Sequence, residues 1–246
     1  SKVYALSPSG TRLYAGGEFT LMNGVARKGL AAIDLSTNTV TSWDPALTQD
    51  GSDVPVIKHL AQYGSTLYVG GTFAAAGGQP RRNLAAISKT TGLPLDFLSN
   101  TNTFDYTAPL VAVNGNKLYV SGVFTTVGDS ARNNLACVDL TTGLVTAWNP
   151  RLNRDPLFGI AFSGSTIYLA GNFDSLGTTP RRSLAAVDDS IGNVNSWSPN
   201  TGMDPQITVW TIQVSGPTVY VGGNFAAIGT TPRTNLAAID AVTGAV

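Results

Sequence analysis

The chain has 246 residues, of which 43% are hydrophobic and 12% charged, a composition that favours a well-buried core and argues against disorder. Its 15 basic residues balance its 15 acidic residues, so it lacks the excess positive charge with which proteins capture nucleic acid or anionic membranes. No hydrophobic run is long enough to span a bilayer, and the single cysteine, Cys137, excludes a disulfide within the chain.

One short motif recurs five times and sets the period of the sequence. An apolar residue and a tyrosine are followed by a second apolar residue, a small residue, a glycine, a variable residue and a phenylalanine. The copies are Leu13–Phe19, Leu67–Phe73, Leu118–Phe124, Ile167–Phe173 and Val219–Phe225. A period of about fifty residues is typical of a repeat protein in which each copy is one structural unit.

A glycine stands four residues before each motif tyrosine and separates two apolar stretches. These glycines are Gly10, Gly64, Gly115, Gly164 and Gly216. Glycine adopts the positive φ that a tight turn requires. Each repeat is therefore predicted to begin with a hairpin whose second strand carries the motif.

An arginine follows each motif phenylalanine after eight residues, and a leucine three residues later opens a third strand. The arginines are Arg27, Arg81, Arg132, Arg181 and Arg233. This constant spacing predicts one loop conformation used five times. The third strand should end in a turn at Asn38, Gly92, Gly143, Gly192 and Gly244, since Asn and Gly suit the left-handed region.

An aromatic residue marks a fourth strand in four of the repeats. These residues are Trp43, Phe97, Trp148 and Trp197. Val246 lies three residues before the place where a fifth would stand, so the last repeat lacks this strand.

Four short antiparallel strands per repeat predict an all-β fold, a β-propeller of five four-stranded antiparallel blades with the fifth lacking its outer strand. The expected blades are 1–46, 54–99, 107–150, 155–199 and 206–246, all within one propeller over 1–246. Two interpretations stay open. Either the five blades close by face-to-face packing alone, which is simpler, or the chain is a segment of a larger ring or tandem array. Lacking an initiating Met, it is expected to be a piece of something longer.

Together, the Gly-Gly-x-Phe run, the Arg loop, Leu-Ala-Ala-Ile-Asp, Thr-Gly and Trp-Asn-Pro resemble the delta-sixty type bacterial propeller repeat, and more distantly quinoprotein and kelch repeats. The resemblance covers all five repeats. It implies a propeller of secreted or surface bacterial proteins and implies no defined activity. The quinone and calcium sites of quinoprotein dehydrogenases find no matching cluster here, so no cofactor is expected.

The five repeated arginines admit two interpretations. They could form a ring of guanidinium groups that binds carboxylate, phosphate or sulfate. Alternatively, each ties its loop to backbone carbonyls or to a neighbouring Asp. Repetition favours the structural role, because a position present in every repeat serves the repeat. The aromatic residues Trp43, Trp148 and Trp197 are assigned a structural role for the same reason.

Other reactive residues also favour structural roles. His59 is the sole histidine and lies in a predicted first strand without metal-binding partners in the sequence. Cys137 occupies a position that other repeats fill with Ala, so it is expected to be a small buried residue. The densest acidic spots, Asp188-Asp189 and Asp50–Asp53, are expected to be turns, although calcium binding stays open. We expect no catalytic and no metal-binding residue.

Residues that differ between repeats are the better candidates for binding. We select Lys28, Arg82 and Arg182 beside the repeated arginines, with Phe104, Tyr106, Arg151 and Arg154 in the variable connections. Aromatic and arginine side chains on an exposed surface suit a sugar or protein partner.

The first hypothesis is a non-catalytic extracellular or cell-surface propeller, a scaffold or protein-interaction module of a larger bacterial surface or secreted protein. Its partners would be other segments of that protein or subunits of a surface assembly. A carbohydrate-binding module that uses the variable face to hold a glycan is the alternative. A glycoside hydrolase or lyase is a third possibility, weakened because Glu18 is the only glutamate.

Overall fold

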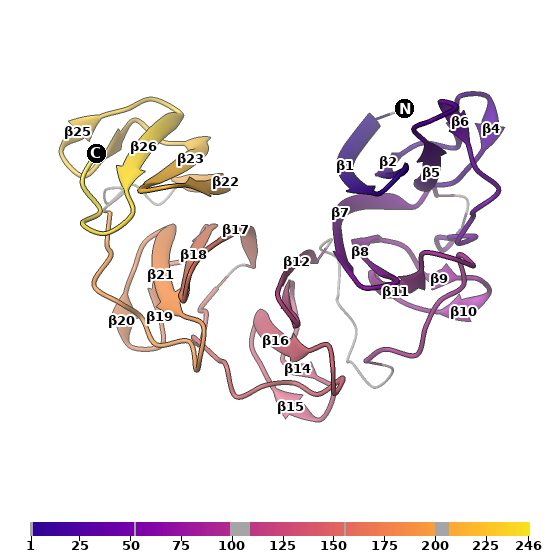
Figure 1. Cartoon of the computed structure of the whole chain (residues 1–246). Coiled ribbons are helices and arrows are strands. Elements are labelled where there is room, and N and C mark those ends of the chain that lie inside the picture. Colours follow the sequence, from indigo (N-terminus) through magenta and orange to yellow (C-terminus); the bar gives the residue numbers. More distant parts are fainter. Residues whose placement is uncertain (1, 52, 99–108, 155, 200–206) are drawn as a thin grey trace. The chain divides into compact units, whose positions relative to one another are not determined.

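The computed structural model describes residues 2–51, 53–98, 109–154, 156–199 and 207–246, whose regular structure is entirely β (Figure 1). The three predicted main strands of each repeat pair antiparallel with the motif strand in the middle, and we number these groups as sheets; the pairing of Glu18 with Val56 joins the first two into one seven-stranded sheet. Sheet 1 contains β1 (Lys2–Ser9), β2 (Arg12–Glu18) and β5 (Leu30–Asp34); sheet 2 contains β7 (Val56–Tyr63), β8 (Thr66–Thr72) and β11 (Leu84–Ser88); sheet 3 contains β12 (Leu110–Asn114), β13 (Lys117–Ser121) and β16 (Leu135–Asp139); sheet 4 contains β17 (Leu157–Ser163), β18 (Thr166–Gly171) and β21 (Leu184–Asp188); sheet 5 contains β22 (Thr208–Ser215), β23 (Thr218–Asn224) and β26 (Leu236–Asp240).

The loop between the second and third strands contains a small hairpin in each described repeat. The hairpins pair β3 (Leu21–Met22) with β4 (Val25–Ala26), β9 (Ala75–Ala76) with β10 (Gln79–Pro80), β14 (Thr126–Val127) with β15 (Ser130–Ala131), β19 (Ser175–Leu176) with β20 (Thr179–Pro180) and β24 (Ala227–Ile228) with β25 (Thr231–Pro232). The constant spacing from Phe to Arg thus reflects one loop conformation, as predicted. Among the described residues no helix is long and apolar enough to cross a membrane.

The two glycine turns of each repeat lie together at one end of its sheet, which we call the turn end. Gly10 has φ 58° and Asn38 has φ 56°, so both occupy the left-handed region, as predicted. The two turns are joined by a hydrogen bond from the Leu35 N–H to the Thr11 carbonyl at 2.8 Å. The hairpins of the preceding paragraph lie at the opposite end, which we call the loop end.

The motif glycines are explained by a close approach of the backbone. A β-bulge shifts the pairing of β7 with β8 between Ile57 and His59. A Cβ atom on Gly71 would lie 2.3 Å from the carbonyl oxygen of Val56. No side chain fits there. The glycines of the Gly-Gly-x-Phe signature are therefore structural, because they let the first strand lie close against the second.

The fourth strand is much shorter than predicted. In the described residues only sheet 1 has one, the two-residue β6 (Thr39–Val40), and sheets 2 and 4 have single bridges in its place. The hairpin stops because the Thr41 hydroxyl accepts a hydrogen bond from the Trp43 N–H at 3.3 Å, which bends the chain away from the sheet. A fourth segment thus pairs with the third strand only over one or two residues, and the number of strands per blade and the number of blades stay predictions.

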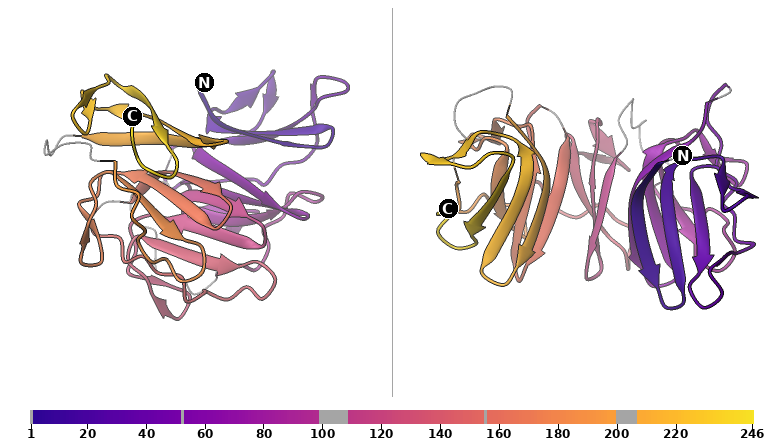
Figure 2. Two further views of the ribbon diagram at one scale, coloured as in Figure 1. Left: turned by 60° about the vertical axis from the view of Figure 1, so that its left-hand side comes forward. Right: turned by 90° about the horizontal axis from the view of Figure 1, so that it is seen from above.

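The chain divides into two units, Ser1–Ser130 with Val138–Leu144, and Ala131–Cys137 with Val145–Val246. Within the first unit sheet 1 packs face to face on sheet 2, and within the second sheet 4 packs on sheet 5 (Figure 2). Each earlier sheet contributes what we call its trailing face, which carries the motif tyrosine and the third-strand leucine. Each later sheet contributes what we call its leading face, which is rich in Ile and Val.

Hydrogen bonds from the trailing face reinforce this packing. Indole N–H groups donate to the carbonyl that ends the third strand of the next repeat, in the pairs Trp43 with Ser88 (2.9 Å), Trp148 with Asp188 (2.8 Å) and Trp197 with Asp240 (2.9 Å). The motif tyrosine stacks edge-on against the tryptophan, with ring centroids 5.0 Å apart for Tyr168 and Trp197. The Tyr168 hydroxyl donates to the Ala241 carbonyl at 2.7 Å. Each such pair therefore joins two repeats by both apolar and polar contacts.

Candidate functional site

The repeated arginines bind backbone carbonyls within their own repeat. The Arg27 guanidinium donates to the carbonyls of Ala26 at 2.7 Å and Thr41 at 2.6 Å. Arg181 does the same with Pro180 and Asn195, both at 2.9 Å. Each guanidinium thus ties the loop hairpin to the segment that leaves the third strand. Arg132 follows this pattern with Ala131 and Thr146, while Arg81 and Arg233 each donate to the carbonyl of the preceding proline.

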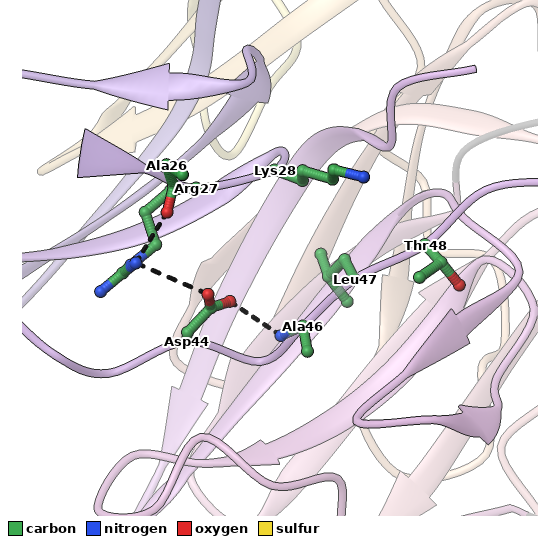
Figure 3. Close-up of a pocket in the computed structure, with 7 residues that line it drawn as sticks. All are labelled: Ala26, Arg27, Lys28, Asp44, Ala46, Leu47 and Thr48. Atoms are coloured by element: carbon green, nitrogen blue, oxygen red, sulfur yellow. Dashed lines mark hydrogen bonds and ion pairs between the residues drawn. The ribbon is translucent and has the colours of Figure 1, made fainter. Parts of the chain in front are cut away.

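A hollow of about 260 Å³ lies at the loop end of sheet 1 (Figure 3). It is lined by Ala26, Arg27, Lys28, Asp44, Ala46, Leu47 and Thr48. Asp44 begins the connection to the next repeat, where it accepts a hydrogen bond from the Ala46 N–H at 2.8 Å. It also pairs with Arg27 at 3.5 Å, so the only carboxylate in this lining is already engaged.

Lys28 lies at the edge of this hollow, and Figure 3 shows its ammonium group directed away from Asp44. Arg27 beside it has its guanidinium turned toward Asp44 and the Ala26 carbonyl. Within the described residues Lys28 forms no ion pair. The two neighbouring residues therefore differ in role: the repeated Arg27 holds the loop, whereas the variable Lys28 faces solvent.

The selected arginines at the loop end form exposed ion pairs. Arg82 pairs with Asp50 at 2.9 Å in the first unit. In the second unit Arg154 pairs with Asp174 at 2.7 Å, and Arg182 approaches the same carboxylate at 3.8 Å. The structure thus brings Arg154 and Arg182 together around one aspartate that sequence reasoning did not single out.

Arg151 occupies a left-handed backbone conformation, with φ 56°, and Arg154 follows with φ 59°. Non-glycine residues rarely adopt this conformation, so this connection is held in a specific shape. The Arg151 N–H donates to the Asn149 side chain at 3.1 Å, and its carbonyl accepts from the Gly177 N–H at 2.8 Å. The other selected residues of the variable connections, Phe104 and Tyr106, lie outside the described residues.

Carboxylates with altered pKa values recur at the same turn in several repeats. Partial burial opposes ionisation of Asp188, but hydrogen bonds from Ser190, Ile191 and Gly192 outweigh it and lower its pKa to about 2. Asp34, Asp139 and Asp240 have lowered pKa values because they accept hydrogen bonds from residues two and three positions later. These carboxylates cap a turn, as expected for Asp188, and they lie at the turn end of their sheets.

His59 and Cys137 belong to the strands. Burial, and to a lesser extent the charge of Lys58, lowers the pKa of His59 to about 4, so the imidazole is neutral at physiological pH. Cys137 is fully buried in β16. In the part of the chain that the structure describes, no three His, Cys, Asp or Glu side chains gather as metal ligands would.

A second left-handed position before the third strand escaped the sequence reasoning. It is occupied by Gly29, Asn83, Asn134, Ser183 and Asn235, with φ between 61° and 72°. The signal was present, because Gly and Asn exchange at this position as they do at the turn after the third strand. Similarly, Asp50 and Asp174 could not be predicted as arginine partners. Asp50 lies in a variable connection, and the other repeats have Thr or Ala at the position of Asp174.

No protein-family model and no curated protein matches the sequence. Solved structures do resemble the fold. The computationally designed Ika8 protein has a TM-score of 0.59 at 13% identity, covering 99% of this chain and 60% of its own. The WD40 beta propeller domain of Doa1 has a TM-score of 0.59 at 9% identity, covering 98% of this chain and 66% of its own. The chain thus spans less than two thirds of either structure, and the likeness shows an all-β, propeller-like fold.

Proposed function

We propose that the chain is a non-catalytic propeller module that binds protein, as a scaffold or interaction module of a larger extracellular or cell-surface bacterial protein. The extracellular and bacterial assignment rests on the resemblance of the repeats to the delta-sixty type. Propellers carry many unrelated functions. The propeller-like fold by itself therefore supports an interaction role and no more specific function. The choice of partner therefore has to come from the loop end.

The observation that carries the proposal is the mixed charge of the loop end. Lys28 is unpaired among the described residues, whereas Arg82 with Asp50 and Arg154 with Asp174 form exposed pairs. An exposed ion pair contributes about 0–1 kcal/mol to stability. Replacing it by an ion pair with a partner protein therefore costs little free energy. In each unit taken by itself, loop-end charges of both signs suit the polar rim of a protein interface better than they suit a polyanion.

The altered pKa values support the non-catalytic part of the proposal. In enzymes, strongly shifted groups usually gather in one cleft. Here the shifted aspartates repeat at the turn end, and hydrogen bonds that hold the turn account for them. The hollow beside Lys28 contains a single carboxylate, Asp44, where glycoside hydrolysis generally requires two.

The test is a binding and turnover screen on the isolated chain. It uses an array of immobilised oligosaccharides and a set of chromogenic glycosides. We expect no saturable binding to any oligosaccharide and no turnover. Saturable glycan binding that is lost in Lys28→Ala and kept in the turn-end control Leu144→Ala would contradict the proposal and favour the carbohydrate-binding alternative. Turnover of a glycoside would contradict the non-catalytic role.

A further inference from the structure

The described residues show what covers each face of a repeat. In the first unit Tyr14, Leu30 and Ala32 of sheet 1 form one buried cluster with Ile57, Leu67 and Ile87 of sheet 2. The equivalent cluster of the second unit joins Tyr168, Leu184 and Ala186 of sheet 4 to Val209, Ile212 and Ile239 of sheet 5. In both units the trailing face of one repeat is thus covered by the leading face of the next, and the two interfaces use equivalent positions.

No other sheet of the second unit covers the trailing face of sheet 5. Tyr220 is 46% exposed, whereas the equivalent tyrosines of the other sheets are at most 5% exposed. Leu236 is 67% exposed, and the equivalent leucines at most 7%. Accordingly β26 alternates exposed and buried residues, while β11 and β21 are buried along nearly their whole length. Trp210 is also exposed, but it lies at the bulge, where Phe158 of sheet 4 is exposed as well.

On the leading face of sheet 1 the first strand, β1, is uncovered within its unit, while Ala15 and Ala31 of the neighbouring strands are buried. Val3 is 51% exposed and Leu6 60% exposed. The residues equivalent to Val3 are Ile57 in sheet 2 and Val209 in sheet 5, and both are fully buried. The chain therefore presents one face of each kind that its own repeats use to bind each other. Apolar surface of this kind marks an interaction site.

We propose that the trailing face of sheet 5 binds the leading face of sheet 1 of a second copy of the chain. Tyr220 and Leu236 would pack on Val3 and Leu6 as Tyr168 and Leu184 pack on sheet 5. The Tyr220 hydroxyl would donate to the Leu35 carbonyl, which is equivalent to the Ala241 carbonyl that Tyr168 binds.

This contact is heterologous, because one copy offers sheet 5 and the other offers sheet 1. Each associated pair retains one free face of each kind, so association continues until the faces meet in a ring or extends as a filament. The surface is separate from the loop end and does not depend on the proposed function.

The test mixes two variants that each disable one face, Leu236→Lys and Leu6→Lys. Sedimentation velocity of the wild-type chain should show association that increases with concentration. Each variant alone should remain monomeric, with association weakened roughly tenfold or more, since a charge replaces a central apolar contact. Their equimolar mixture should form a one-to-one dimer, because one variant retains an intact sheet 5 and the other an intact sheet 1.

Leu144→Lys is the matched control, since Leu144 is 68% exposed and lies in neither face. It should associate like the wild type. Thermal unfolding checks that each variant folds, and Ala238→Glu replaces Leu236→Lys if that variant does not. A wild-type chain that is monomeric at every concentration would overturn the proposal. So would a mixture that fails to form the dimer, or a disulfide between Val3→Cys and Tyr220→Cys that forms within a single chain.

Discussion

Aspartates at the turn end show how single residues hold the repeat. The Asp188 carboxylate accepts hydrogen bonds from the backbone N–H groups of Ser190 at 2.9 Å, Ile191 at 2.8 Å and Asn193 at 2.9 Å. Repeat 2 has Ser88 in this place, and its hydroxyl accepts one such bond, from the Thr91 N–H at 3.2 Å. The carboxylate therefore accepts hydrogen bonds from more N–H groups of the turn than a hydroxyl does.

The Asp188→Asn variant should be less stable near neutral pH by about 1 kcal/mol, because the amide loses charge-assisted bonds at a site partly screened by solvent. The folded-state pKa of about 2 lies below the ordinary value of 3.8. The stabilisation by Asp188 is therefore complete above about pH 4 and lost as the pH falls through about 2. Urea unfolding across this range should show a weaker acid dependence in the variant than in the wild type.

Asp129→Asn is the control for this measurement, since Asp129 is exposed in a hairpin turn. It should leave the free energy of unfolding nearly unchanged. An unaltered acid dependence in Asp188→Asn would show that this carboxylate does not hold the turn.

At the residue scale, exchange between Gly and Asn was enough to predict the turn after the third strand. Ser183 shows where the same signal fails. It adopts φ 61° although serine seldom favours this conformation, and its hydroxyl donates to the Ile207 carbonyl at 3.2 Å. A contact with a distant segment fixes its backbone, so local sequence could not reveal it.

Between elements, tryptophan is the feature that joins one repeat to the next. The Trp148→Phe variant keeps the buried ring but removes the 2.8 Å hydrogen bond to the Asp188 carbonyl. It should lower the free energy of unfolding by about 1–2 kcal/mol, because a buried acceptor loses its donor. Chemical denaturation measures the loss.

Phe97 provides the reciprocal test, since repeat 2 has phenylalanine where repeats 1, 3 and 4 have tryptophan. By equivalence, Phe97→Trp places an indole N–H toward the Asp139 carbonyl. It should raise the free energy of unfolding by up to about 1 kcal/mol. Equal stability of both variants and the wild type would show that packing alone, without the hydrogen bond, joins the repeats.

Two adjacent arginines separate structural from surface roles. Arg181→Ala removes the bonds to the Pro180 and Asn195 carbonyls and should cost about 2 kcal/mol. Arg182→Ala removes a partly exposed ion pair of 3.8 Å with Asp174 and should change the free energy of unfolding by no more than about 0.5 kcal/mol. Thermal unfolding of both variants compares them. Similar losses would contradict the division of roles between the repeated and the variable arginine.

The strands illustrate how far periodicity could predict the elements. Three strands per repeat followed from apolar stretches and glycine spacing. The fourth was overestimated because an aromatic residue after a turn resembles a strand, whereas Thr41 redirects Trp43 into the core. The loop hairpins were missed because strands of two residues leave no period to detect.

For the whole molecule, the two uncovered faces link stability to concentration. If the chain associates through them, its unfolding midpoint should rise as protein concentration increases, because association stabilises only the folded state. The Leu236→Lys variant should show no such rise, and Leu144→Lys should behave like the wild type. Differential scanning calorimetry over a dilution series makes the comparison, and a concentration-independent midpoint in the wild type would contradict self-association.

Across the whole molecule the repeated polar residues hold the fold, and we propose that the variable ones of the loop end bind a partner. Repetition predicted the first group from sequence. The second group could only be named as candidates, since each of the ion pairs Arg82–Asp50 and Arg154–Asp174 takes one partner from a variable connection that follows no period.

The most direct measurement of this division is photo-crosslinking from the loop end. A photoreactive amino acid replaces Lys28 in one variant and Leu144, at the turn end, in another. Both variants are irradiated with the surface and secreted proteins of the producing cell, and adducts are identified by mass spectrometry. The account predicts one dominant protein adduct from position 28 and none from position 144. Equal labelling from both positions, or no protein adduct from position 28, would contradict it.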